Sequence, residues 1–377
     1  MSKPKFILSP RCIVFTYYFL WFGLAPLYAE RYREIDFSNV LDVSSFFYLL
    51  TSYTLLMVIC TLCESEDEKT NHSKIEVNIN LSPIFIFVLV SFVLYLLNTG
   101  GVSHWLNNID RAFLTRSGAG LYYLMFILTL PIYLFFAGVK YKGKSRIIIF
   151  LCMIVLLLSP FIGSKQKIIY MFLVLFLPVF YRSRLKINNI LYIVIPVISI
   201  FILGNYFRNA SWMTSNDILA YSLNYFDTYD SLKMVLKDYH AFDFFSFLLP
   251  FNKILNLFSG GDDFFDISAY LTNIYFPHAW NIRATVQYPI EVDLYLSFGY
   301  WLGLPFMVIF MLIYIVVYNL AMKSIYPIVI FIWFYLFIYI LSHLRGGIIL
   351  WTDLYTYPYL ITLFIVYRKK LFYVDKN

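Results

Sequence analysis

The chain has 377 residues and a net charge of +7, and its composition is far from that of a soluble domain. Hydrophobic residues make up 61% of it and charged residues only 14%, against roughly 45–50% and about 25% in soluble domains. This composition excludes a soluble globular protein and predicts an all-α polytopic membrane protein. The net positive charge is explained by membrane anchoring, and nucleic acid is not predicted as a partner.

Apolar stretches of about 17–25 residues can cross a bilayer as helices. Segments of this kind recur along the chain, and we expect about ten transmembrane helices, within a range of about 10–12. They are Cys12–Ala29, Leu41–Cys63, Leu81–Leu97, Leu121–Val139, Ile147–Ile162, Ile168–Tyr181, Ile190–Tyr206, Leu294–Leu320, Ile325–Leu341 and Ile348–Val366.

Basic residues set the orientation, because Lys and Arg in short loops resist translocation. With the N-terminus inside, more than half of the 29 Lys and Arg residues fall in the cytoplasm. Both termini are therefore predicted to be cytoplasmic. No small-residue cleavage site follows the first apolar segment at Ala29, so we expect a retained helix rather than a signal peptide.

The sequence predicts a single integral membrane domain in three parts: residues 1–206 with transmembrane helices 1–7, a long periplasmic loop at 207–290, and residues 291–377 with helices 8–10 and a cytoplasmic tail. Within the loop, apolar residues of Asp217–Lys237 recur at helical spacing. The more apolar Phe242–Phe258 is too broken to cross the bilayer. We expect it to lie along the membrane interface or to fold onto the helix bundle.

Five cations are expected at the outer membrane face: Lys165, Lys167, Arg208, Arg283 and Arg345. Charges at this depth are costly unless they are paired or functional. Arginine forms bidentate contacts with phosphate oxygens, so converging arginines on one leaflet suit a lipid-linked pyrophosphate. The alternative is that each cation anchors the chain to lipid headgroups.

Two acids, Glu291 and Asp293, precede the eighth predicted helix, just above Gly299 and Gly303. The two glycines have the GxxxG spacing that allows close helix packing in membranes. A low-dielectric setting strengthens a carboxylate as a proton acceptor, which makes both acids candidate general bases. They could equally stabilise the N-terminus of the helix. His278 is a third candidate base, or a structural histidine among aromatic residues.

Motifs for other chemistries were not found. The sequence contains no His/Cys ligand set and no G-x-x-x-x-G-K-[ST] phosphate loop. We therefore predict no metal site and no cofactor.

The architecture and several local motifs together resemble a known family. The chain has about ten to twelve predicted helices and one large outer loop late in the sequence. The motifs are Arg208 after the helix that opens the loop, Asn281-x-Arg283-x-Thr285, Phe298-Gly299-x-x-x-Gly303, and Gly163-Ser164-Lys165. In these features the chain resembles the Wzy-type O-antigen or oligosaccharide repeat-unit polymerases. Lys165 stands where that family often has arginine, which keeps the charge but loses the bidentate geometry.

The resemblance implies a glycosyltransferase of the bacterial inner membrane that uses no nucleotide sugar. Its donor and acceptor would be oligosaccharide repeat units on undecaprenyl pyrophosphate, with membrane lipid and a chain-length-regulating co-polymerase as further partners. Arg208, Arg283, Arg345 and Lys165 would bind the pyrophosphate. A base among Glu291, Asp293 and His278 would deprotonate the acceptor hydroxyl.

Two alternatives stay open. A glycosyltransferase that uses polyprenyl-phosphate sugars has a similar layout and places a catalytic acid in its first outer loop, where Glu30, Glu34 and Asp36 are available. A non-enzymatic flippase or transporter of lipid-linked oligosaccharides is the other alternative. Transporters often have repeated halves and charges at the middle of the bilayer, whereas no repeat is visible in this sequence.

Overall fold

The computed structural model describes residues 9–26, 42–64, 80–107, 120–141, 144–162, 165–180, 226, 228–256, 258, 264–278, 286–324 and 327–371. All regular elements within these residues are helices, which confirms the all-α prediction for this part of the chain. The chain divides into two compact units. Unit 1 comprises Met1–Pro4, Thr70–Ile218 and Ile325–Tyr335, and unit 2 comprises Lys5–Lys69, Leu219–Ser324 and Leu336–Asn377.

Several helices have the length and composition of membrane spans. Four qualify alone: Val43–Cys63, Gly120–Lys140, Ile290–Ala321 and Pro327–Leu344. A fifth is obtained if Ser82–Asn98 and Gly101–Asn107, bent by 72°, form one broken span. Helices overlap every predicted span except Ile190–Tyr206, which lies outside the described residues. The full number of spans, the location of the termini and the three-part division of the chain stay predictions.

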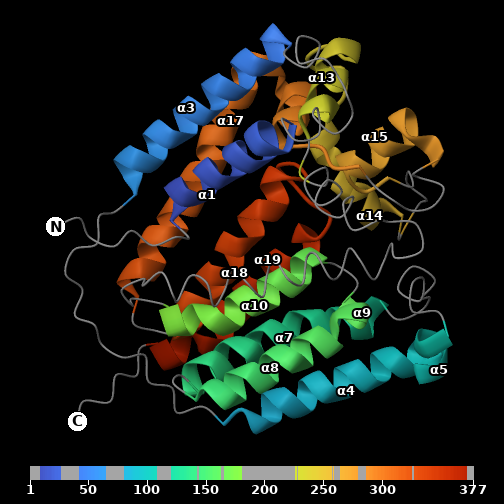
Figure 1. Cartoon of the computed structure of the whole chain (residues 1–377), viewed down its shortest axis with the longest axis vertical. Coiled ribbons are helices and arrows are strands. Elements are labelled where there is room, and N and C mark those ends of the chain that lie inside the picture. Colours follow the sequence, from blue (N-terminus) through green and yellow to red (C-terminus); the bar gives the residue numbers. More distant parts are fainter. Residues whose placement is uncertain are drawn as a thin grey trace. The chain divides into compact units, whose positions relative to one another are not determined.

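In unit 1, α7 (Gly120–Lys140) packs between α4 (Ser82–Asn98) and α10 (Lys165–Phe180) (Figure 1). Phe126 of α7 lies 5.1 Å from Phe92 of α4 between ring centroids. On the side facing α10, a Cβ at Gly138 would come within 2.3 Å of the Leu175 carbonyl oxygen, so only glycine permits this approach. The helices of unit 1 are α4 (Ser82–Asn98), α5 (Gly101–Asn107), α7 (Gly120–Lys140), α8 (Ser145–Leu157), α9 (Ser159–Ile162), α10 (Lys165–Phe180) and the first part of α18 (Pro327–Leu344).

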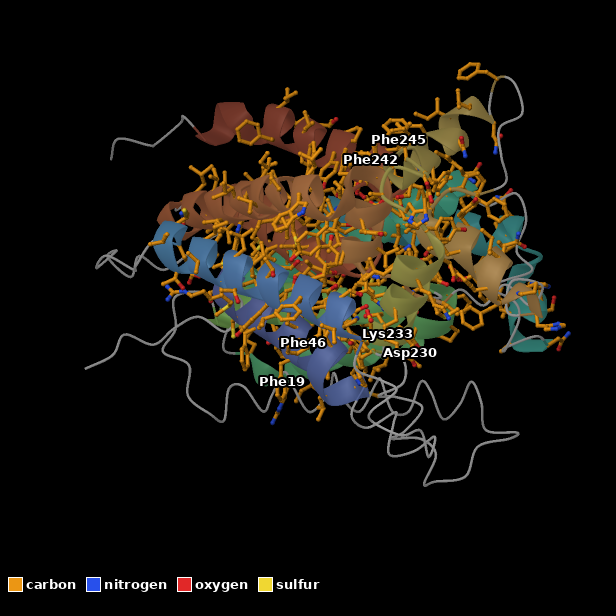
Figure 2. All side chains as sticks on the ribbon, turned by 90° about the horizontal axis from the view of Figure 1, so that it is seen from above. Phe19, Phe46, Asp230, Lys233, Phe242 and Phe245 are labelled. Carbon is orange, nitrogen blue, oxygen red and sulfur yellow. The ribbon has the colours of Figure 1, made fainter. Side chains whose placement is uncertain are left out.

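In unit 2, α1 and α3 lie beside α17 (Figure 1). Phe19 and Phe46 project from the outer side of η1 and α3 (Figure 2) and are 54% and 47% exposed, as expected for side chains that face lipid. The helices of unit 2 are α1 (Pro10–Tyr17), the π-helix η1 (Tyr18–Leu24), α3 (Val43–Cys63), α13 (Tyr229–Asp238), the 3₁₀ helix η3 (Ser246–Phe251), α14 (Asn252–Leu255), α15 (Ile267–Tyr275), α17 (Ile290–Lys323), the end of α18, and α19 (Asp353–Leu371).

A break at Gly299 divides α17 into a short first helix and a long second one. Gly299 has φ 70° and ψ −179°, a conformation open essentially only to glycine. The sequence predicted instead a continuous helix with a GxxxG packing face, and that prediction is wrong at Gly299. Gly303 does make a close approach, because a Cβ there would lie 3.2 Å from Cβ of Leu294 in the first piece of the same helix.

The break creates a docking site for the outer loop. Helix ends leave carbonyl groups without intrahelical partners, and the carbonyl of Leu296 accepts a hydrogen bond from the backbone N–H of Phe242 at 3.1 Å. Phe242 itself has φ 70°, an uncommon value for a residue with a side chain. Of the two alternatives predicted for Phe242–Phe258, this contact and the buried Leu249 show that its described residues fold in part onto α17.

The helix predicted within Asp217–Lys237 is found in part. Its second half coincides with α13, and its first half lies outside the described residues. Asp230 and Lys233 form an ion pair of 3.4 Å on α13 (Figure 2). Because both side chains are partly exposed, the pair contributes little to stability.

Substitution of Gly299 by alanine tests the break. A Cβ at Gly299 would lie 2.8 Å from Cβ of Ala241 and would force alanine into a glycine-only conformation, so we expect a stability loss of about 1–3 kcal/mol or more. Thermal unfolding of the purified protein in detergent measures it. Gly120→Ala is the matched control, since a Cβ there meets no atom within 4 Å. Equal melting of the two variants would contradict the assigned role of Gly299.

Candidate functional site

Glu291 lies in the first turn of α17 and is fully buried. The Tyr17 hydroxyl is 3.0 Å from its Oε2, and the Tyr18 hydroxyl donates to its Oε1 at 2.6 Å. The Tyr48 hydroxyl donates to its backbone carbonyl at 3.2 Å. Tyrosines from α1 and η1 therefore meet at the Glu291 carboxyl group, and a tyrosine from α3 binds the backbone of the same residue. The helix changes from α to π geometry at Tyr18, and π turns are rare and frequent at functional sites.

The hydrogen bonds of Tyr17 indicate whether the Glu291 carboxyl group is charged. The Tyr17 hydroxyl also lies 2.7 Å from the carbonyl oxygen of Leu344, yet a phenol has only one proton to donate. Both contacts are satisfied together when Glu291 carries a proton and donates it to Tyr17. A neutral carboxyl group also avoids the cost of burying an isolated charge. In this arrangement Glu291 joins α1 to the end of α18, and its role as a base stays a prediction.

Asp293, two residues further along α17, is 2% exposed and binds two other parts of unit 2. Its Oδ2 accepts a hydrogen bond from the backbone N–H of Ile348 at 2.7 Å, and its Oδ1 accepts one from the Ser246 hydroxyl of η3. Ser246 is in turn 3.0 Å from the Ser297 hydroxyl. A Cβ at Gly347 would come within 2.7 Å of Asp293 Oδ2, and Gly347 has φ 121°. Position 347 therefore requires glycine, because the chain after α18 passes close to the Asp293 carboxylate there.

The two acids hold the backbone on both sides of Arg345. Leu344 is bound through Tyr17, and Ile348 is bound directly by Asp293. Arg345 is 5% exposed, which is unusual for arginine. The structure thus brings together three of the predicted site residues, Glu291, Asp293 and Arg345, at the start of α17 and the end of α18.

His343 belongs to the same cluster and was not among the predicted site residues. His343 is fully buried. Its Nδ1 lies 3.2 Å from the carbonyl oxygen of Gly347. Its Nε2 lies 3.2 Å from the Tyr357 hydroxyl and 3.5 Å from Oδ1 of Asp353. The Gly347 carbonyl can only accept, so it fixes the proton on Nδ1. The sequence feature that could have indicated a role for His343 is its position two residues before Arg345.

The other predicted residues are not joined to this cluster by any described contact. His278 follows α15, and its side chain is exposed. Arg208 and Arg283 lie outside the described residues. Lys165 is the first residue of α10, and its side chain is outside the described part of the chain.

Comparison with known proteins gives no match. No family model, no curated protein and no solved structure is significantly similar to this chain. The chemistry of the site must therefore be argued from its own residues.

Replacement of Tyr18 by phenylalanine tests the tyrosine cluster. It removes the donor to Glu291 Oε1 in a fully buried setting, and leaving a buried acceptor unsatisfied costs about 1–3 kcal/mol. Thermal unfolding in detergent should show this loss. Tyr53→Phe is the matched control, because Tyr53 packs against the Tyr18 ring at 5.3 Å but makes no hydrogen bond found among the described residues. A loss of equal size in both variants would argue against the hydrogen bond as its cause.

Proposed function

We propose that this chain polymerises oligosaccharide repeat units carried on undecaprenyl pyrophosphate into O-antigen or a similar surface polysaccharide. A hydroxyl group of the terminal sugar on one unit attacks the anomeric carbon of the chain on another. The bond from that carbon to the pyrophosphate oxygen breaks, and undecaprenyl pyrophosphate leaves with the electron pair. The hydroxyl proton passes to a base, and no nucleotide sugar takes part.

The observation that carries the proposal is the meeting of acids, arginine and outer loop at one end of α17. Ser246 brings the loop to Asp293, and Asp293 and Glu291 fix the backbone around Arg345. An arginine held in this way is suited to a phosphate group, because a preorganised cation needs no rearrangement as negative charge develops on the leaving group. Transporters often have repeated halves, and no repeat is visible in this sequence.

The proposal also includes the finer topology expected from the sequence. The chain would form about ten to twelve transmembrane helices in the bacterial inner membrane. Its termini would lie in the cytoplasm and the loop in the periplasm. Arg208, Arg283 and Lys165 would add to the pyrophosphate site, and a chain-length-regulating co-polymerase would be a partner.

Replacement of Arg345 by alanine tests the pyrophosphate role. We expect the variant to remain in the membrane but to extend chains about 100-fold more slowly or worse, as when a single group that stabilises transition-state charge is removed. A gene-replacement strain would then show glycan with a single repeat unit. Arg345→Lys should recover part of the rate, because it restores the charge without the bidentate geometry. Lys237→Ala, at an exposed position of α13, is the control. Wild-type chain lengths in Arg345→Ala would refute the role.

The amide variants Glu291→Gln and Asp293→Asn test whether either acid is the general base or only stabilises the fold. Glutamine can accept from Tyr18 and donate to Tyr17, and asparagine can accept from Ile348 and donate to Ser246, so both should fold. A general base contributes about 10²–10⁴-fold in rate, and we expect one of the two variants to lose activity on that scale with its melting temperature unchanged. Normal polymerisation by both would place the base elsewhere, with His278 the remaining predicted candidate.

Extension of a purified undecaprenyl-pyrophosphate repeat unit, without nucleotide sugar, is the decisive assay. A polymerase yields a ladder of lengths from this substrate alone. If the chain instead requires a polyprenyl-phosphate sugar, and alanine at Glu34 and Asp36 abolishes its activity, the alternative glycosyltransferase is favoured. If a deletion strain shows no repeat unit at all on its lipopolysaccharide core, export or ligation is indicated.

A further inference from the structure

The loop segment from Phe242 to Ile254 presents an apolar residue at every third position. Phe245, Leu248 and Phe251 fall at or beside the 3₁₀ helix η3. Side chains three residues apart lie above one another in a 3₁₀ helix, so Leu248 and Phe251 of η3 lie in one row, and Phe242, Phe245 and Ile254 continue the same spacing on either side of η3. We call these five residues the exposed row: Phe242, Phe245, Leu248, Phe251 and Ile254, which are 50%, 49%, 49%, 39% and 40% exposed.

The opposite side of the segment is fixed to the protein. Ser246 and Leu249, also three residues apart, are buried, and Ser246 donates to Asp293. The backbone N–H of Phe242 donates to Leu296. Because the segment is bound to α17 at Phe242 and Ser246 and Leu249 is buried, rotation cannot bury the exposed row against α17. Figure 2 shows Phe242 and Phe245 close together on the outer side of this segment.

A continuous path of aromatic rings joins the exposed row to the outer face of α17. Ring centroids are 6.1 Å apart for Phe245 and Phe247, 5.3 Å for Phe247 and Phe298, and 4.1 Å for Phe298 and Phe306. Phe306 is 44% exposed and lies five residues beyond Trp301, which is 78% exposed. Both belong to the helix that is long and apolar enough to cross the membrane, where exposed aromatic residues face lipid.

We propose that the exposed row inserts into the bilayer, at the boundary between headgroups and acyl chains, beside the point where α17 enters the membrane. The occupant of this surface is lipid, because the row continues the lipid-facing surface of α17. The polar residues of the segment suit this depth. Lys253 is exposed with its Nζ 4.0 Å from the Phe265 ring centroid, and a lysine at a membrane interface keeps its charge at the headgroups while its stem lies on apolar surface. Asp243, also exposed, is turned to the backbone N–H of His240 at 2.6 Å.

The inference does not rest on the proposed polymerase activity, and its experiment measures lipid contact alone. Leu248→Cys, in a background with Cys12, Cys60, Cys63 and Cys152 replaced by serine or alanine, is labelled with the fluorophore NBD. The labelled full-length protein is reconstituted in phosphatidylcholine and phosphatidylglycerol vesicles that contain lipids with nitroxide groups at a shallow or a deep acyl position. Phe306→Cys is the control on the lipid face, and Lys237→Cys is the control on the exposed surface of α13.

We expect the label at position 248 to lose fluorescence to the shallow nitroxide as strongly as the label at 306, and more than to the deep nitroxide. The label at 237 should keep its fluorescence with both lipids. An unquenched label at 248 with water-like emission would overturn the proposal. An unquenched label with blue-shifted emission would also overturn it, because protein from this chain or a second copy would then cover the row.

A second measurement needs no substitution. The unmodified protein in the same vesicles is treated with a bilayer-dissolved diazirine that forms a carbene on illumination, and labelled peptides are mapped by mass spectrometry. Modification of residues 242–255 together with the lipid face of α17 supports insertion. Modification of α17 without the loop segment refutes it.

Discussion

Burial of two carboxyl groups within one helical turn is the constraint on which unit 2 depends. A buried carboxyl group is tolerated only if its oxygens, and its proton when it carries one, have hydrogen-bond partners. Glu291 and Asp293 therefore draw on side chains and backbone from other elements. Tyr17 and Tyr18 come from the first helices of the chain, Ser246 from the outer loop and Ile348 from the segment after α18. Segments far apart in sequence are joined at this point by hydrogen bonds rather than by apolar packing alone.

The break at Gly299 makes this arrangement possible. A continuous helix from Ile290 would hold every carbonyl in its own ladder and leave none for Phe242. Because the helix stops, Leu296 can bind the loop backbone, and the loop then brings Ser246 to Asp293. The absence of a side chain at Gly299 serves the same end, since Ala241 lies against it. A conformation open only to glycine is thus used to join the segment that begins at Phe242 to a helix of membrane-spanning length.

The sequence was most informative about where helices lie and least informative about how they end. Apolar length predicted the segments that became α3, α7 and α18, because the requirement to satisfy backbone groups in lipid leaves little choice. The same reasoning could not predict the break at Gly299, since Phe-Gly-Tyr-Trp-Leu-Gly fits a continuous helix equally well. For the site, acid and arginine were predicted from their unusual place in an apolar chain. Tyr17 and Tyr18 were hidden because tyrosine is abundant throughout, with 34 in the sequence, and their partner lies more than 270 positions away.

The segment from Phe242 to Ile254 links the exposed row to the buried Asp293 through the short 3₁₀ helix η3. In that geometry Leu248 and Ser246 lie on different sides of the same short helix, so a shift of the exposed row would move the hydroxyl that binds Asp293. An α-helix of the same sequence would rotate each successive third residue by about 60° and would not keep the two rows apart. The tighter helix is therefore the form in which this segment can contact lipid and a carboxylate at once. If the exposed row lies in lipid, the bilayer itself helps to position Asp293, and through Ile348 the backbone beside Arg345.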